Sequence, residues 1–254
     1  MPRSRLPLIL AIVAVVAVLG GFVTFQQLLA GDDVARLTLP PASTATPDPS
    51  ATEPGSSTDP SAGADTGSGS ATAAELAGTW TVGDGSVVGY RVREQIGGVS
   101  ALTDAVGRTS AVTGTATLEA TGDALTVSAA EFEADLTQLE SDESRRDNRI
   151  RSIGLQSDEF PTGTFVLTQP IDVPAAALAG ETVDITMTGD LTIHGVTKEV
   201  SIPGQARLNG DLIEVVGAVT FLFTDFGMTP PDVAGFVQVE DEATLEVLIS
   251  LARG

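Results

Sequence analysis

The chain has 254 residues, and its 34 acidic against 13 basic residues give a formal net charge of −21. It has no cysteine and one histidine, His194, which excludes disulfides, sulfur-ligated metals and sites built on several histidines. A surface this acidic repels nucleic-acid phosphate, so no nucleic-acid partner is expected. Because the chain lacks cysteine and a second histidine, we also expect no metal, and no other cofactor.

The first segment, residues 1–31, is predicted to be a membrane anchor. From Leu6 to Phe25 it is almost wholly apolar, about the 20 residues that a helix needs to cross the hydrocarbon core. Arg3 and Arg5 precede this run, which places the N-terminus in the cytoplasm and the rest of the chain outside it. We therefore expect a single-pass signal anchor in the cell membrane, with a cleaved signal peptide as the competing interpretation.

The second segment, residues 32–75, is expected to be a disordered linker. From Pro40 to Ala74 it is rich in Pro, Ser, Thr, Ala, Gly and Asp and lacks aromatic and large aliphatic residues. Such a sequence cannot bury enough apolar surface to offset the entropy lost on ordering. The segment would act as a tether, either as a bare spacer or as a glycosylated stalk.

The third segment, residues 76–254, has the pattern of an all-β domain. Residues 182–193 alternate strictly between apolar side chains and Thr or Asp, as in a strand with one wet face. Within residues 125–136 the apolar phase slips by one position, which predicts a β-bulge. Gly-Asp pairs at 122–123 and 210–211 predict hairpin turns. Many antiparallel strands of this kind favour a sandwich or a closed barrel.

One stretch, residues 141–154, departs from the β pattern and is predicted to be a helix. Ser141 or Asp142 can cap its N-terminus, and acidic residues occupy its first turn. An apolar stripe through Ile150 and Ile153 is expected to pack on the sheet. Since this helix falls between strands, it could plug or cover one end of a barrel.

Four short stretches, in this order and spacing, resemble the YceI family. They are Arg145-Arg146-Asp147-Asn148, Asp158-Glu159-Phe160-Pro161 with Thr164-Phe165, Gly189-Asp190-Leu191-Thr192-Ile193-His194-Gly195-Val196-Thr197, and Asp225-Phe226-Gly227-Met228. The resemblance covers residues 76–254 and implies an antiparallel, lipocalin-like β-barrel that binds long apolar chains such as polyisoprenoids. It does not extend to the predicted anchor and linker.

The expected ligand site is the inside of the barrel, where apolar side chains would replace water around an isoprenoid or other long-chain lipid. The residues predicted to line it are Phe132, Leu136, Ile150, Ile153, Phe165, Leu167, Met187, Leu191, Phe221, Phe223 and Phe226. Arg146 and His194 are candidate contacts for a polar head group. Against these roles, Arg146 could pair with nearby carboxylates, His194 could hold a turn, and the phenylalanines could form an ordinary core.

Three hypotheses for the function follow. The leading one is a membrane-tethered, extracytoplasmic lipid-binding barrel that is not an enzyme. The first rival is an envelope interaction or adhesion module, in which the barrel is solid and its surface binds a partner. The second is a hydrolase or isomerase that uses His194 with a carboxylate.

Overall fold

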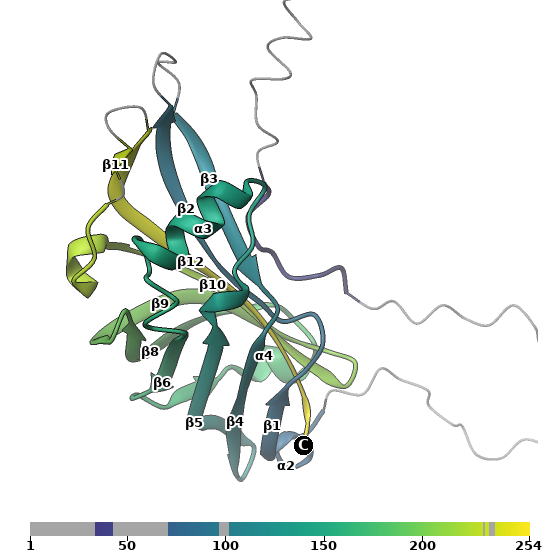
Figure 1. The fold of residues 1–254 in the computed structure, drawn as a ribbon. Coiled ribbons are helices and arrows are strands. Elements are labelled where there is room, and N and C mark those ends of the chain that lie inside the picture. Colours follow the sequence, from purple (N-terminus) through teal and green to yellow (C-terminus); the bar gives the residue numbers. More distant parts are fainter. Residues whose placement is uncertain (1–33, 43–70, 97–101, 231, 234–236) are drawn as a thin grey trace, which may run out of the picture. The chain divides into compact units, whose positions relative to one another are not determined.

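The computed structural model describes residues 34–42, 71–96, 102–230, 232–233 and 237–254 (Figure 1). The apolar run predicted to be a membrane anchor lies outside them, as do residues 43–70 of the predicted linker. No helix within these described ranges has the length and apolar character needed to cross a bilayer.

Twelve strands within the described residues form one antiparallel sheet. They are β1 (Gly78–Val82), β2 (Val87–Ile96), β3 (Leu102–Thr109), β4 (Val112–Thr121), β5 (Ala124–Asp135), β6 (Thr162–Leu167), β7 (Ile171–Val173), β8 (Val183–Ile193), β9 (Val196–Asn209), β10 (Leu212–Leu222), β11 (Asp232–Val233) and β12 (Val237–Arg253). The helices are α2 (Ala73–Leu76), α3 (Ser144–Ser152) and α4 (Ala175–Leu178), with single 3-10 turns η1 (Leu136–Gln138) and η2 (Phe223–Phe226).

Strands β1, β4, β5, β6, β8, β9, β10 and β12 pair in this order, and β12 pairs back to β1. The sheet therefore closes into an eight-stranded antiparallel barrel, which confirms the predicted fold class. The hairpin β2–β3 continues the sheet along β12, while the short strands β7 and β11 pair with β5 and β12.

The long strand β12, of 17 residues, holds the closure together. One of its edges pairs with β10 over the whole of that strand. Its other edge pairs with β1 near the end of the strand and with β2 before it. A register irregularity between Val239 and Ala243 bends it against β2.

The strand patterns seen in the sequence have direct counterparts in the structure. Along β8, Val183, Met187, Leu191 and Ile193 are buried, as the alternation predicts. In β5, Ala129 and Val127 pair with two consecutive residues of β4. Ser128, between them, is skipped in the register and is the extra residue of the predicted bulge. Both Gly-Asp pairs form the two-residue loops of the hairpins β4–β5 and β9–β10.

The predicted helix is shorter than expected and begins later. α3 starts at Ser144, and its N-cap is Glu143, whose carboxylate accepts a hydrogen bond from the Arg145 backbone N–H. Ser141 does not cap the helix, because its side chain and backbone N–H both donate to the Asp147 carboxylate. The expected packing of Ile153 on the sheet is also wrong, since Ile153 follows the last helical turn and is 59% exposed.

Helix α2 lies at one end of the barrel beside β1, the strand that carries the only tryptophan, Trp80 (Figure 1). Thr72 and Glu75 form a capping box around the first turn of α2. Leu76 is buried, and its backbone carbonyl accepts a hydrogen bond from Trp80 Nε1 at 2.9 Å. The guanidinium of Arg253 lies 5.0 Å from the centre of the Trp80 ring. Figure 1 places α3 toward the opposite end, beside β2 and β3.

The two ends of the predicted linker belong to the barrel domain. Residues 36–40 lie along its outside, where Pro40 accepts a hydrogen bond from Arg207 at 2.5 Å and Leu37 is half-buried. At the other end, the Ala71 backbone N–H donates to the Leu178 carbonyl at 2.9 Å. The prediction of disorder is therefore wrong for these stretches, and residues 43–70 remain outside the description.

Candidate functional site

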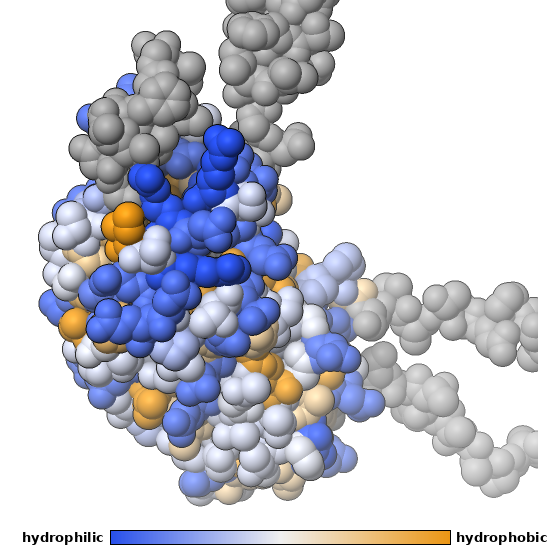
Figure 2. All heavy atoms as spheres, in the orientation of Figure 1, coloured by the Kyte–Doolittle hydropathy of each residue, from blue (hydrophilic) through white to orange (hydrophobic). Residues whose placement is uncertain are grey.

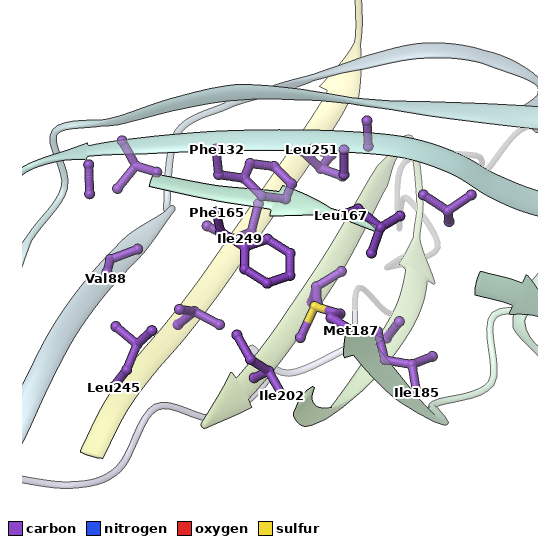
Figure 3. A pocket seen from close by; sticks show the side chains of 18 of the residues that line it. Val88, Phe132, Phe165, Leu167, Ile185, Met187, Ile202, Leu245, Ile249 and Leu251 are labelled. Atoms are coloured by element: carbon purple, nitrogen blue, oxygen red, sulfur yellow. The ribbon is translucent and has the colours of Figure 1, made fainter. Parts of the chain in front are cut away.

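The barrel encloses an apolar cavity of about 210 Å³ (Figure 3). Its walls come from strands all around the ring, with Leu76 at the α2 end and Leu155, from the loop after α3, also in the lining. The polar or charged residues in the lining are Tyr90, Glu133, Thr164 and Arg207; the others are hydrocarbon residues, methionine and glycine. Figure 3 shows Phe132, Phe165 and Met187 pointing into this space from three strands.

The strand alternation explains both the walls and the space between them. On β12, Leu245, Val247, Ile249 and Leu251 all line the cavity, so every second side chain of this stretch points inward. Ala130 of β5 lies directly opposite Ala116 of β4, and both are cavity-lining residues. Such small side chains leave volume that larger ones would fill, and an apolar cavity of this kind stays dry.

Seven of the predicted lining residues are in the cavity wall: Phe132, Leu136, Phe165, Leu167, Met187, Leu191 and Phe221. Phe223 and Phe226 are buried instead in a neighbouring core cluster, because η2 turns the chain away after β10. Ile150 and Ile153 also lie outside the lining. Sequence reasoning missed Val88 and Tyr90, although their spacing along β2 carries the same alternation as the other strands.

Arg146 is bonded on both sides within the chain. Its guanidinium donates to Glu94 of β2 at 2.6 Å and to Asp142, four residues earlier. The Arg146 side chain is 19% exposed and that of Glu94 is 9% exposed, so their ion pair is largely shielded from solvent. This ion pair links α3 to β2, although Arg146 and Glu94 are 52 residues apart in the sequence. Arg146 is not in the cavity lining, and contact with a head group stays a prediction for it.

Among the described polar residues of the cavity lining, Tyr90 has a hydroxyl without a hydrogen-bond partner. The hydroxyl oxygen is buried and has no hydrogen-bond partner among the described residues. Burial raises the pKa of Tyr90 well above its usual value, while the positive charge of Arg146 acts in the opposite direction. The negative charges of Asp147, Glu94 and Asp142 raise the pKa further. The hydroxyl is therefore a protonated donor held in an apolar site beside the charged groups of α3.

The model of the YceI-like domain matches residues 80–251, well over half of the chain. The chain belongs to the YceI-like family. This match begins at Trp80 in β1 and ends at Leu251 in β12, so it contains nearly all of the closed ring and of the cavity lining, without Leu76 of α2. It leaves α2 and residues 36–42 as parts of this domain that lie outside the matched range.

Curated relatives and solved structures of known proteins agree with this assignment. A UPF0312 protein of Vibrio vulnificus is 29% identical over 113 residues, covering 42% of this chain and 56% of the relative. A UPF0312 protein of Shewanella denitrificans is 32% identical over 115 residues, with the same coverage of 42% and 56%. The YceI-like chain thus matches little more than half the length of these relatives.

A polyisoprenoid-binding domain from Saccharophagus degradans, implicated in plant cell wall breakdown, has a similar fold. The TM-score is 0.53 at 15% identity, and the match covers 69% of this chain and 98% of that domain. BcnA of Burkholderia cenocepacia gives a TM-score of 0.49 at 17% identity, covering 65% of this chain and 95% of BcnA. At these identities, the likeness to the Saccharophagus domain concerns the fold alone.

Three of the stretches that resemble the YceI family meet around His194. The His194 and Phe160 rings lie 4.5 Å apart, and Nδ1 of His194 lies 3.2 Å from the Phe226 carbonyl oxygen. His194 and Gly195 form the two-residue loop of the β8–β9 hairpin, with φ of 52° and 71°. Two positive φ values in succession are typical of a type I′ turn. The motif thus builds a turn and brings together segments that are distant in the sequence, the one before β6 and the turn η2.

The hydrogen bonds of His194 leave neither ring nitrogen free. The Phe226 carbonyl can only accept, so Nδ1 donates to it. Nε2 lies 2.5 Å from the Gln156 side-chain amide, which can present its oxygen or, after a half-turn, its NH₂ group. Neither arrangement leaves a lone pair exposed for general-base chemistry. Within the described residues there is also no group of three or more side chains able to hold a metal ion.

Proposed function

We propose that this YceI-like barrel binds a long apolar molecule, a polyisoprenoid or another long-chain lipid, inside its cavity. The observation that carries the proposal is the apolar cavity itself, enclosed by a closed ring of strands. The similar fold of the Saccharophagus polyisoprenoid-binding domain supports the same class of ligand. Binding would consist of enclosing the ligand, with no covalent step.

The energetics favour a ligand of several apolar units. An isoprene unit has five carbons, and each buried apolar carbon contributes about 0.8 kcal/mol, so one unit gains roughly 4 kcal/mol gross. Association costs roughly 4–15 kcal/mol in lost translational and rotational freedom. A few units would therefore offset this cost in a cavity whose walls are hydrocarbon along most of their extent.

The proposal includes tethering at the outer side of the cell membrane. Its support is the apolar run from Leu6 to Phe25 with Arg3 and Arg5 before it, a pattern typical of a signal anchor. A barrel held at the envelope would meet its ligand where lipids leave or enter the bilayer. Protease protection of the barrel domain in intact cells, lost in permeabilised cells, would contradict this location.

Native mass spectrometry of the full chain, extracted gently from membranes, tests the function directly. We expect a bound species whose mass corresponds to a prenyl or acyl lipid and which leaves at higher collision energy. Stripped protein should take up the same lipid again from vesicles. Protein that carries no lipid, and takes up neither prenyl nor acyl chains, would refute the proposal. Co-purification of a protein partner without lipid would instead support the interaction module.

A further inference from the structure

The Tyr90 side chain occupies space that is open because the residue opposite it, Gly107, has no side chain. Tyr90 pairs with Gly107 across β2 and β3, and the ring packs against the glycine. A Cβ at Gly107 would lie 2.3 Å from Tyr90 Cε1 and 2.7 Å from the hydroxyl oxygen, which no real side chain permits. Gly107 therefore leaves the space that the Tyr90 ring and hydroxyl occupy, and Tyr90 is one of the residues that line the cavity.

The Tyr90 ring joins the two hydrophobic clusters of the barrel. It packs against the cluster around Trp80 and also against the cluster around Phe226. A phenylalanine would fill this position without leaving a polar atom unbonded. A buried hydroxyl without a partner costs about 1–3 kcal/mol, and an acceptor atom supplied by a ligand would remove this cost.

The charges near this hydroxyl are unfavourable for an anion. Among the charges that shift the pKa of Tyr90, Arg146 is positive, and Glu94, Asp142 and Asp147 are negative. Two of these carboxylates already accept hydrogen bonds from Arg146 itself. A phosphate or pyrophosphate head placed beside Tyr90 would meet net negative charge in a region of low dielectric constant.

We propose that Tyr90 is the polar anchor of the bound lipid, donating its hydroxyl hydrogen to an uncharged acceptor oxygen in the ligand head. This inference rests on the proposed lipid-binding function and narrows it. The ligand class is a neutral lipid with a carbonyl or similar acceptor, and lipid phosphates are disfavoured. The head group of the lipid would lie near Tyr90, on the side of the barrel where α3 lies, and the lipid tail would extend along the hydrocarbon walls toward α2.

A competition experiment with three lipids of related skeleton tests this assignment. The full chain is offered geranylgeranylacetone, which has a neutral ketone, together with squalene, which has no polar atom, and separately together with geranylgeranyl phosphate. Native mass spectrometry gives the ratio of the bound species. We expect wild-type protein to prefer the ketone in both mixtures. The Tyr90→Phe variant should lower the ketone-to-squalene ratio about tenfold, as expected for one buried hydrogen bond.

Two further variants separate a lost hydrogen bond from a disturbed cavity. Met228→Leu conserves volume in the buried cluster around Phe226, outside the cavity lining, and should leave the ketone-to-squalene ratio unchanged. Gly107→Ala retains the hydroxyl but displaces the ring, and should reduce the ratio as Tyr90→Phe does.

Each remaining outcome has a distinct meaning. An unchanged ratio in Tyr90→Phe would overturn the anchor but leave lipid binding standing. A preference of wild-type protein for the phosphate would overturn the selection against charge. Uptake of none of the three lipids by wild-type protein would refute the proposed function itself, and the anchor with it.

Discussion

Replacing Ala130 by isoleucine should distinguish a hollow barrel from a solid one. Ala130 lies in the cavity wall opposite Ala116 of β4, and isoleucine suits a strand. The substitution adds three carbons. If they enter the dry cavity, each gains about 0.8 kcal/mol, so the ligand-free protein should become more stable by up to about 2 kcal/mol. In a filled interior the same change would cost about 1–3 kcal/mol through overpacking.

The change in stability thus has opposite signs for a hollow and for a filled barrel, and the two expected values differ by about 3–5 kcal/mol. Urea unfolding of delipidated protein measures the free energy, and the fluorescence of the only tryptophan, Trp80, follows the transition. Lipid uptake by the same preparation should fall because the added side chain occupies ligand space. Higher stability together with lower uptake is the expected pair of results.

Ala129 provides the matched control on the same strand. Its side chain is exposed on the outer face of β5, next to Ala130. Ala129→Ile should change the stability by less than about 0.5 kcal/mol and leave lipid uptake intact. A loss of stability in Ala130→Ile, with uptake unaffected, would refute the hollow cavity and favour the solid barrel.

Three further predictions concern single side chains. Glu246 is 2% exposed and accepts hydrogen bonds from Arg91 at 2.8 Å and from Arg108 at 3.2 Å, so Glu246→Ala should cost about 3–5 kcal/mol in urea unfolding; a loss under about 1 kcal/mol would contradict a buried ion-pair network. Tyr90 is the only tyrosine, and burial raises its pKa in the folded protein. Its neutral hydroxyl therefore contributes its full stabilisation below the pKa of about 10 in the unfolded chain, and this contribution is lost as the pH rises toward the pKa in the folded protein. Phenolate absorbance that appears near pH 10 in folded protein would contradict this. His194→Ala should lower stability by about 1–2 kcal/mol through lost hydrogen bonds and leave lipid uptake unchanged; loss of a catalytic turnover with the fold intact would revive the enzyme hypothesis.

Local rules predicted the strands well because each strand here has one buried face. The alternation along β8 identified its inward residues, and the phase slip in β5 located the bulge at Ser128. The lining residues that came from such strands are in the cavity wall. The family resemblance identified the closed barrel, which the alternation alone left open against a sandwich.

The errors arose where a short-range rule competed with a partner distant in sequence or with another side chain. Ser141 satisfies the rule for an N-cap, but the Asp147 carboxylate binds it, and the cap passes to Glu143. Residues 36–40 fall within the predicted linker, yet Arg207, far away in the sequence, donates a hydrogen bond to the Pro40 carbonyl. The role of Tyr90 depends on Gly107 and on the charges near α3, which only the folded arrangement brings together.

The long strand β12 also constrains the order of events during folding. The register partners Trp80 and Arg253 close the ring, so β1 has one barrel edge unpaired until β12 has been synthesised and docked. Bringing together segments so distant in sequence is entropically costly, and such contacts slow folding. An incomplete barrel would expose the edges of β1 and β10 as well as its apolar walls, a state open to wrong pairing and aggregation. A lipid that binds the closed barrel would draw the chain out of that state by mass action.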